Sequence, residues 1–123
     1  MLYLIITLAF VGGFFLVRTR YVDVIIKTNA PDYIDQSPRI IGGLPLLGNW
    51  QDHSHKMIRR DDGLYETKLR IQANTLVEFK FSLGNWESVE KGKRFVEIPN
   101  RKISANRSKV IEFEIANFAG FED

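Results

Sequence analysis

The stretch DDGLYETKLRIQANTLVEFKFSL, residues 61–83, decides the fold class of this chain. Apolar and polar residues alternate in two runs, 64–71 and 76–83, and the Asp-Gly pair that precedes them is typical of a tight hairpin turn. Successive side chains of a β-strand point to opposite faces, so each run presents one apolar face. The stretch therefore predicts two strands, each of which buries one face against a core.

Similar short runs recur in the rest of the chain beyond residue 20, and no segment there has the apolar periodicity of an amphipathic helix. Turn residues separate the runs at spacings of roughly eight to twelve residues, which is typical of β-sandwiches and barrels. The spacing predicts an all-β domain in which the apolar faces of two sheets pack together. The further predicted strands are Tyr21–Thr28, Arg39–Gly42, 56–59 and 110–116.

The first twenty residues differ from the rest. Residues 2–17 are apolar except for Thr7 and two glycines, and the run stops at Arg18 and Arg20. As a helix the run would be about 24 Å long, short of a hydrocarbon core of about 30 Å, so its length lies between a signal-peptide core and a short anchor. No basic residue precedes the run and no cleavage signature follows it. We therefore expect an N-terminal hydrophobic helix at 1–20 that forms an uncleaved single-pass membrane anchor, with a signal segment as the alternative, followed by a domain at 21–118 and a tail at 119–123.

The charge distribution argues against a nucleic-acid partner. The chain has 17 basic and 15 acidic residues, and without Arg18 and Arg20 the numbers are equal. A domain with balanced charge lacks the one-sided field that phosphate binding needs. The same two arginines favour the cytoplasmic side for the domain under the positive-inside rule.

Catalytic and metal-binding patterns are missing from the sequence. There is no cysteine, and His53 and His55 have no third histidine or cysteine to complete a metal site. Asp61 and Asp62 are explained by the turn that they open. We therefore expect no metal, no other cofactor and no enzymatic activity.

The order of short motifs along the chain points to a family. IIGG, LLGNW, DDGLYETKLRI, VEFKF, GNW and IPNR follow one another between residues 40 and 101. This order resembles the starch-binding domain, carbohydrate-binding module family 20, and the glycogen-binding domain of the AMP-activated kinase β subunit. The resemblance covers residues 21–116 and implies an immunoglobulin-like antiparallel β-sandwich that binds α-glucan chains without cleaving them.

The resemblance also implies a set of site residues. In the family, the glucan lies across two tryptophans, a lysine and an asparagine, because the C–H face of a pyranose stacks on an aromatic ring while its hydroxyls need polar partners. Lys80 is expected to point outward from the polar face of its strand. Carried over by motif, the residues are Trp50 of LGNW, Lys80 of EFKF, Trp86 of GNW and Asn100 of PNR.

One departure from the family leaves the site and the function open. Thirteen residues, 87–99, separate Trp86 from Asn100, which is more than is common in starch-binding domains. A similar W-E-x-V-E-K-G…E-I-P-N-R arrangement accompanies starch-binding-like domains attached to bacterial enzymes. Trp50 is either half of a sugar platform or a lid over the end of the core. The chain is accordingly either a membrane-tethered carbohydrate-binding domain that acts beside a glycan-active enzyme, or a protein-interaction or envelope domain that has lost sugar binding.

Overall fold

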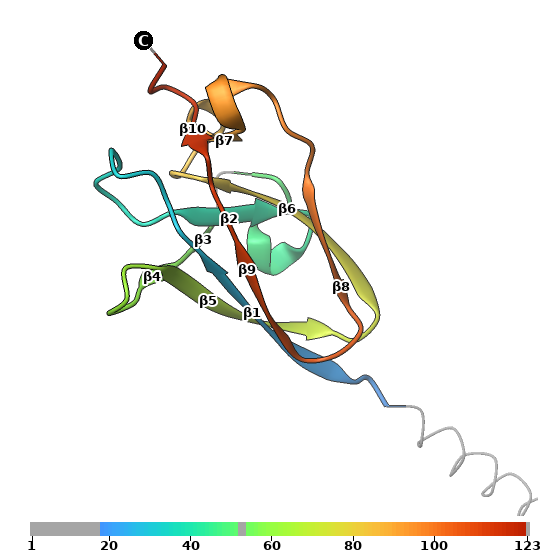
Figure 1. Cartoon of the computed structure of the whole chain (residues 1–123). Coiled ribbons are helices and arrows are strands. Elements are labelled where there is room, and N and C mark those ends of the chain that lie inside the picture. Colours follow the sequence, from blue (N-terminus) through green and yellow to red (C-terminus); the bar gives the residue numbers. More distant parts are fainter. Residues whose placement is uncertain (1–17, 52–53, 123) are drawn as a thin grey trace, which may run out of the picture.

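The computed structural model describes residues 18–51 and 54–122, which form two four-stranded β-sheets packed face to face and a small two-stranded ribbon (Figure 1). This confirms the predicted all-β sandwich. Residues 18–20 have no regular secondary structure, and the rest of the predicted anchor helix lies outside the described residues. Over the described part of the chain, no helix has the length and apolarity needed to cross a bilayer.

The first sheet has the strand order β4-β5-β1-β9. β1 lies inside it, antiparallel to β5 and parallel to β9, so that Val24 is opposite Leu69 on one side and Lys109 on the other. The parallel pair is an exception to the expected antiparallel arrangement. The strands are β1 Tyr21–Thr28, β4 Ile58–Arg59, β5 Tyr65–Gln72 and β9 Lys109–Phe113.

The second sheet has the order β3-β2-β6-β8, with all pairs antiparallel. Its strands are β2 Arg39–Gly42, β3 His55–Lys56, β6 Thr75–Ser82 and β8 Arg101–Ala105. β7 Glu90–Lys91 pairs with β10 Asn117–Phe118 in the ribbon at one end of the sandwich (Figure 1). Within residues 18–51 and 54–122 there are also three short 3-10 helices: η1 Pro45–Leu47, η2 Trp86–Ser88 and η3 Lys93–Phe95.

The core lies between the two sheets and is built from alternate residues of each strand, as the periodicity predicts. Val24 and Ile26 of β1 and Leu69 of β5 are fully or almost fully buried from one side, and Phe79 and Phe81 of β6 from the other. The rings of Phe79, Phe81 and Phe113 meet edge to face, with centroids 5.4–5.9 Å apart. Such contacts add to the stability that burial of the rings provides.

Several strand boundaries differ from the prediction. The run 56–59 is two strands in different sheets, since β3 pairs with β2 and β4 with β5, and buried Met57 lies at the crossing. The last predicted strand ends early, at Phe113, although Ile115 beyond it is still buried. β8 was not predicted: its alternation is clear only at the buried Ile103 and Ala105, among polar residues that resemble a loop.

A paired-tryptophan surface on the second sheet

The outer face of the second sheet is partly covered by loops. Ile41 and Lys80 are opposite each other in the β2/β6 register, and directly opposite residues share a face. Their neighbours Ile40 and Phe81 belong to the core, so Ile41 and Lys80 point away from it. Both are nevertheless buried, with only 1% and 9% of their surfaces exposed.

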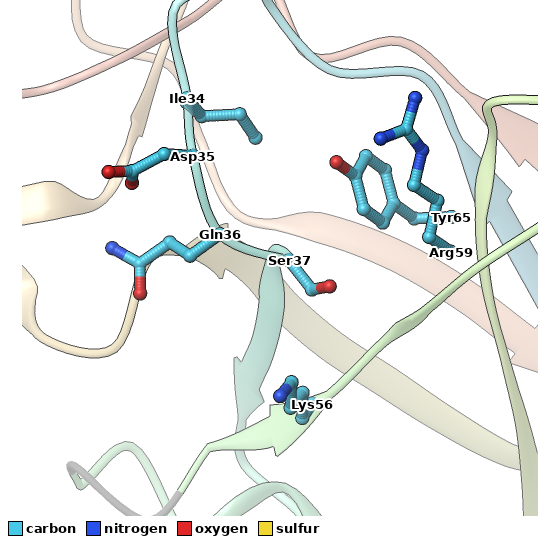
Figure 2. Close-up of a pocket in the computed structure, with 7 residues that line it drawn as sticks. All are labelled: Ile34, Asp35, Gln36, Ser37, Lys56, Arg59 and Tyr65. Carbon is cyan, nitrogen blue, oxygen red and sulfur yellow. The ribbon is translucent and has the colours of Figure 1, made fainter.

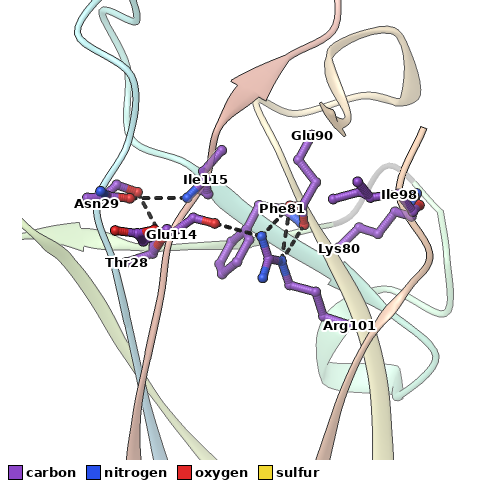
Figure 3. Close-up of polar contacts among 9 residues, drawn as sticks. All are labelled: Thr28, Asn29, Lys80, Phe81, Glu90, Ile98, Arg101, Glu114 and Ile115. Atoms are coloured by element: carbon purple, nitrogen blue, oxygen red, sulfur yellow. Dashed lines mark hydrogen bonds and ion pairs between the residues drawn. The ribbon is translucent and has the colours of Figure 1, made fainter. Parts of the chain in front are cut away.

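The loop that covers Lys80 is the segment 92–100. The Lys80 ammonium donates a hydrogen bond to the carbonyl oxygen of Ile98, with Nζ and O 2.7 Å apart (Figure 3). Ser82, two residues further on the same face, is also buried. Lys80 was expected to point outward, and it does point away from the core, but its burial was not predicted, because strand alternation gives the face of a side chain and not what lies over that face.

Trp50 is held over β2 by a sharp turn. Gly48, Asn49 and Trp50 all have left-handed backbone angles, with φ of 87°, 51° and 63°. The turn brings the chain back so that the Trp50 N–H donates to the carbonyl oxygen of Gly42 at 2.8 Å. A Cβ atom on Gly43 would lie 3.2 Å from Nε1 of the Trp50 ring. The ring can therefore lie this close to the main chain only because residue 43 has no side chain.

Trp86 is the first residue of η2 and contacts Trp50. The Asn85 side chain caps this short helix by accepting from the Ser88 N–H at 3.0 Å. The Trp86 indole N–H donates to the main-chain oxygen of Trp50 at 3.2 Å. The two rings are 26° from parallel, their centroids are 6.1 Å apart, and Trp86 is 42% exposed while Trp50 is half-buried. The structure thus brings together the two predicted tryptophans, which are 36 residues apart in sequence.

Asn100 lies two residues beyond Ile98, the residue that accepts the Lys80 hydrogen bond. Its side chain is exposed and lines a hollow of about 400 Å³ together with Lys91, Pro99 and Glu114. It makes no hydrogen bond to Trp50 or Trp86. The structure therefore links Asn100 to Lys80 through the 92–100 segment but does not place it against the tryptophan rings.

An ion pair that sequence reasoning missed joins the two ends of this segment. Arg101 binds the carboxylate of Glu90 through Nη2 at 2.8 Å and Nε at 3.0 Å (Figure 3). The Glu90 side chain is completely buried and also accepts from the Phe81 N–H at 2.8 Å. The sequence carried no signal of this burial, because β7 has only two residues and is too short to show a period.

A separate hollow of about 430 Å³ lies between the loop that precedes β2 and strands β3 to β5 (Figure 2). Ile34 and Tyr65 give it apolar surface, and Asp35, Lys56 and Arg59 surround them with both signs of charge. Nearby, His55 contacts the Thr67 hydroxyl through Nε2 at 2.7 Å, and its burial lowers the pKa of its imidazole. The other histidine considered as a metal ligand, His53, is outside the described residues.

Known proteins share this architecture. The chain aligns over 81% of its length with the glycoside hydrolase family 15 glucoamylase from Hypocrea jecorina (TM-score 0.64, 19% identity, 18% of that chain). It aligns over 80% with gamma-CGTase from alkalophilic Bacillus clarkii (TM-score 0.63, 16% identity, 16% of that chain). The family 20 carbohydrate-binding module of the maltotetraose-forming amylase from Pseudomonas saccharophila STB07 aligns over its whole length with 75% of this chain (TM-score 0.50, 15% identity). The chain thus has the fold of a starch-binding β-sandwich, and the resemblance inferred from its motifs is confirmed.

Two amylopullulanases are similar to this chain in sequence. The chain is 32% identical over 84 residues to an amylopullulanase of Thermoanaerobacter thermohydrosulfuricus and 29% identical over 86 residues to one of Thermoanaerobacterium thermosulfurigenes. Each match covers 68% of this chain but only 6% and 4% of the two amylopullulanases. No protein-family model matches the chain.

Proposed function

We propose that this chain is a non-catalytic carbohydrate-binding module for α-glucan chains. The observation that carries the proposal is the Trp50–Trp86 pair, two nearly parallel rings fixed to each other on the outside of the second sheet. Aromatic rings presented in this way suit the apolar C–H faces of neighbouring glucose units. The fold shared with a family 20 module supports the same function.

The tryptophan pair is organised before any ligand arrives. The Trp86 indole N–H already donates to the Trp50 main-chain oxygen, and the Trp50 main-chain N–H donates to the Gly42 oxygen. Little side-chain or loop freedom would then be lost on binding, and this loss is a main cost of association. We expect dissociation constants in the millimolar to micromolar range, about −4 to −8 kcal/mol, since two rings and a few hydrogen bonds make a small site.

We propose Lys80 and Asn100 as the polar part of the site. Lys80 has three ammonium donors and uses one on Ile98, so the side chain holds the 92–100 segment and would reach a sugar hydroxyl through the 9% of its surface that is exposed. The exposed Asn100 amide supplies a donor and an acceptor from that segment. Asn100 would contact a glucose unit beyond those stacked on the rings, because it lines a hollow to which neither tryptophan contributes.

The choice of α-glucan as the ligand, and of a glycan-active enzyme as the partner, rests on similarity. The two sequence relatives are amylopullulanases, and the family 20 module belongs to a maltotetraose-forming amylase. Those names describe whole proteins of which the sequence matches cover only a small part. We therefore propose that this domain delivers a separate enzyme to its glucan rather than acting on the glucan itself.

We also propose that residues 1–20 attach the domain to a membrane as a single-pass anchor. The support is the apolar sequence of residues 2–17, which ends at Arg18 and Arg20. The two arginines favour a cytoplasmic domain. Flotation of the full chain with phospholipid vesicles tests the attachment.

Tryptophan fluorescence of the detergent-solubilised chain tests sugar binding. We expect a saturable change with maltoheptaose and β-cyclodextrin but none with cellopentaose. Trp50→Ala and Trp86→Ala should each abolish binding, measured by calorimetry, and change the free energy of unfolding by no more than about 1 kcal/mol. Tyr21→Ala is the matched control, because Tyr21 is an aromatic of similar exposure that lies away from the pair, and it should leave binding unchanged.

The alternative function, a protein-interaction or envelope domain, predicts the opposite results. A folded chain that shows no response to any glucan up to several millimolar would support a protein-interaction or envelope domain. In that case the half-buried Trp50 would be a packing residue, and Trp50→Ala would lower stability well beyond that of the Tyr21→Ala control.

A further inference from the structure

Three segments meet at the end of the sandwich where β1 begins, and we call this surface the entry pole. The Ala73 N–H donates to the Arg20 oxygen at 2.7 Å, which joins the β5–β6 turn to the start of β1. The Asn74 N–H donates to the Ala105 oxygen at 2.7 Å, which joins the same turn to β8. Figure 1 shows the start of β1 at the end of the molecule opposite to β7 and β10. The entry pole consists of residues 18–22, 70–77 and 102–111.

The entry pole is strongly basic. None of its three segments contains an aspartate or a glutamate, and its basic residues are Arg18, Arg20, Arg70, Lys102, Arg107 and Lys109. The nearest carboxylates already face cations of the same region. Asp23 lies 3.6 Å from the Arg70 guanidinium and 4.0 Å from the Lys68 ammonium, and Glu78 lies 3.9 Å from the Lys102 ammonium.

Three arginines of the entry pole are available to an outside partner. Arg18, Arg20 and Arg107 are exposed, and their side chains make no ion pair or hydrogen bond within the described part of the chain. Arg18 and Arg20 line a hollow of about 450 Å³ with the β5–β6 turn. Two large apolar side chains, Tyr21 and Leu76, are 49% and 62% exposed at the same pole. Exposed arginines interspersed with an aromatic and an aliphatic side chain match the polar and apolar layers of a bilayer surface.

The chain geometry keeps this pole close to residues 2–17. Only Arg18, Thr19 and Arg20 separate the apolar run from β1, and three residues span at most about 11 Å. If the run lies in a membrane, as proposed above, Arg18, Arg20 and the start of β1 lie within about one Debye length of the headgroups, where exposed cations are attracted by anionic lipids.

We infer that the entry pole binds the anionic headgroups of the membrane to which the chain is attached, and so fixes the orientation of the domain. This inference rests on the proposed attachment. The Trp50–Trp86 pair is on another surface, since Trp50 is bonded to Gly42, and Gly42 is opposite Phe79 in the middle of β6. A domain docked through its entry pole therefore keeps the tryptophan pair open to solvent at the side.

The experiment uses the full chain in lipid nanodiscs with a single fluorescent label. The chain has no cysteine, so Gln72→Cys places one label at the entry pole and Gln36→Cys places one in the loop before β2, remote from the pole. A quencher attached to lipid headgroups then reports contact. We expect the Gln72 label, and not the Gln36 label, to be quenched in discs with 30% phosphatidylglycerol, to be released by 0.5 M NaCl, and to be free in pure phosphatidylcholine.

Two matched charge variants complete the test. Arg18→Gln/Arg20→Gln/Arg107→Gln should abolish the quenching, since each arginine removed lowers the ratio of docked to undocked domain about fivefold. Lys56→Gln/Arg59→Gln/Lys93→Gln removes the same charge from exposed side chains elsewhere and should leave quenching unchanged.

Equal quenching in both lipids, or unchanged quenching in the arginine variant, would overturn the inference. So would displacement of the label from the bilayer by duplex DNA at equal phosphate concentration, which would mark a general polyanion surface. Flotation of the same samples separates these outcomes from a failure of the membrane attachment itself.

Discussion

Gly42 and Glu78 approach so closely across the β2/β6 pair that a Cβ atom on Gly42 would lie 2.5 Å from the Glu78 carbonyl oxygen. The neighbouring Gly43 meets only the Trp50 ring, at 3.2 Å. Gly42→Ala should therefore destabilise the fold by about 3 kcal/mol, because a backbone oxygen within a sheet cannot move aside. Gly43→Ala should change stability by less than about 1 kcal/mol but weaken maltoheptaose binding about tenfold, because the ring must tilt.

Urea unfolding and calorimetric titration of the two glycine variants check this contrast. Each variant is the control for the other, since both add one methyl group to adjacent positions. Loss of stability in Gly43→Ala would show that the Trp50 ring belongs to the packing of the fold. Undiminished binding in a stable Gly43→Ala chain would remove Trp50 from the proposed site.

The Glu90–Arg101 pair predicts a large stability loss on removal of the arginine. The Glu90 side chain is fully buried, and the Arg101 guanidinium also lies 5.2 and 5.3 Å from the ring centroids of Phe81 and Phe113 and donates to the Glu114 oxygen at 2.7 Å. Arg101→Met leaves a buried carboxylate without its partner and should cost about 3–5 kcal/mol. Arg107→Met, at an exposed site, should cost at most about 0.5 kcal/mol.

The double variant Glu90→Gln/Arg101→Met separates charge from packing. Since the uncompensated carboxylate is then gone, the double variant should recover part of the stability lost in Arg101→Met. A double variant less stable than Arg101→Met by the full cost of a second mutation would show that the pair does not act as a unit. Chemical denaturation at neutral pH measures the free energy of unfolding of the parent chain, of Arg101→Met, of Arg107→Met and of the double variant.

Removal of the Lys80 ammonium should loosen the 92–100 segment, which it binds through the Ile98 oxygen. Lys80→Met keeps most of the buried side-chain volume but removes the donor to the Ile98 oxygen, and should cost about 1–3 kcal/mol. The Gly92 amide, which donates to the Val96 oxygen at 2.8 Å inside the segment, should exchange with deuterium faster. Lys102→Met on the neighbouring strand loses only an exposed ion pair with Glu78, so its stability should stay within about 1 kcal/mol and the Gly92 exchange unchanged.

His55 should make the free energy of unfolding depend on pH in the acid range. Burial lowers the pKa of its imidazole from 6.5, so the unfolded chain takes up a proton more readily than the folded chain. The free energy of unfolding is then highest above pH 6.5 and falls as the pH drops from 6.5 through the lower folded-state pKa. Urea unfolding of His55→Gln should show a flatter pH dependence in this window than the parent chain.

Two carboxylates do not disturb that window. A hydrogen bond from the Leu64 N–H lowers the pKa of Asp62, and one from the Lys91 ammonium lowers the pKa of Glu97, so both carboxylates stay ionised at pH 6.5, where the decline caused by His55 begins. Parallel curves for His55→Gln and the parent would contradict the prediction.

Alternation of residue type was sufficient to predict the long strands. β5 and β6 are regular enough to be read directly, and the bounds of β1 and β2 were predicted without error. The short strands could not be predicted, because two residues carry no period: nothing in the run 56–59 shows that its halves pair with different sheets. The parallel partner of β1 is a property of tertiary packing, which local pattern does not encode.

The candidate site was predicted in part. The motifs identified Trp50 and Trp86, and the structure brings their rings together. The burial of Lys80 was not predicted, since it depends on the path of the 92–100 segment, and that path is set by a buried pair, Glu90–Arg101, that is formed only after the chain folds. The contribution of each of these residues to sugar binding stays a prediction.

The parallel pairing of β1 with β9 also has a consequence for biosynthesis. The Asp23 N–H is bonded to the Ser108 hydroxyl, 85 residues further along the chain, and Val24 is opposite Lys109. β1 thus cannot complete its sheet until β9 has been translated. Pairings of such long range close slowly, and β1, an apolar strand, would meanwhile offer an open edge to which other chains can bind. The pairing of β9 with β1 therefore also protects the chain against association with other chains during synthesis.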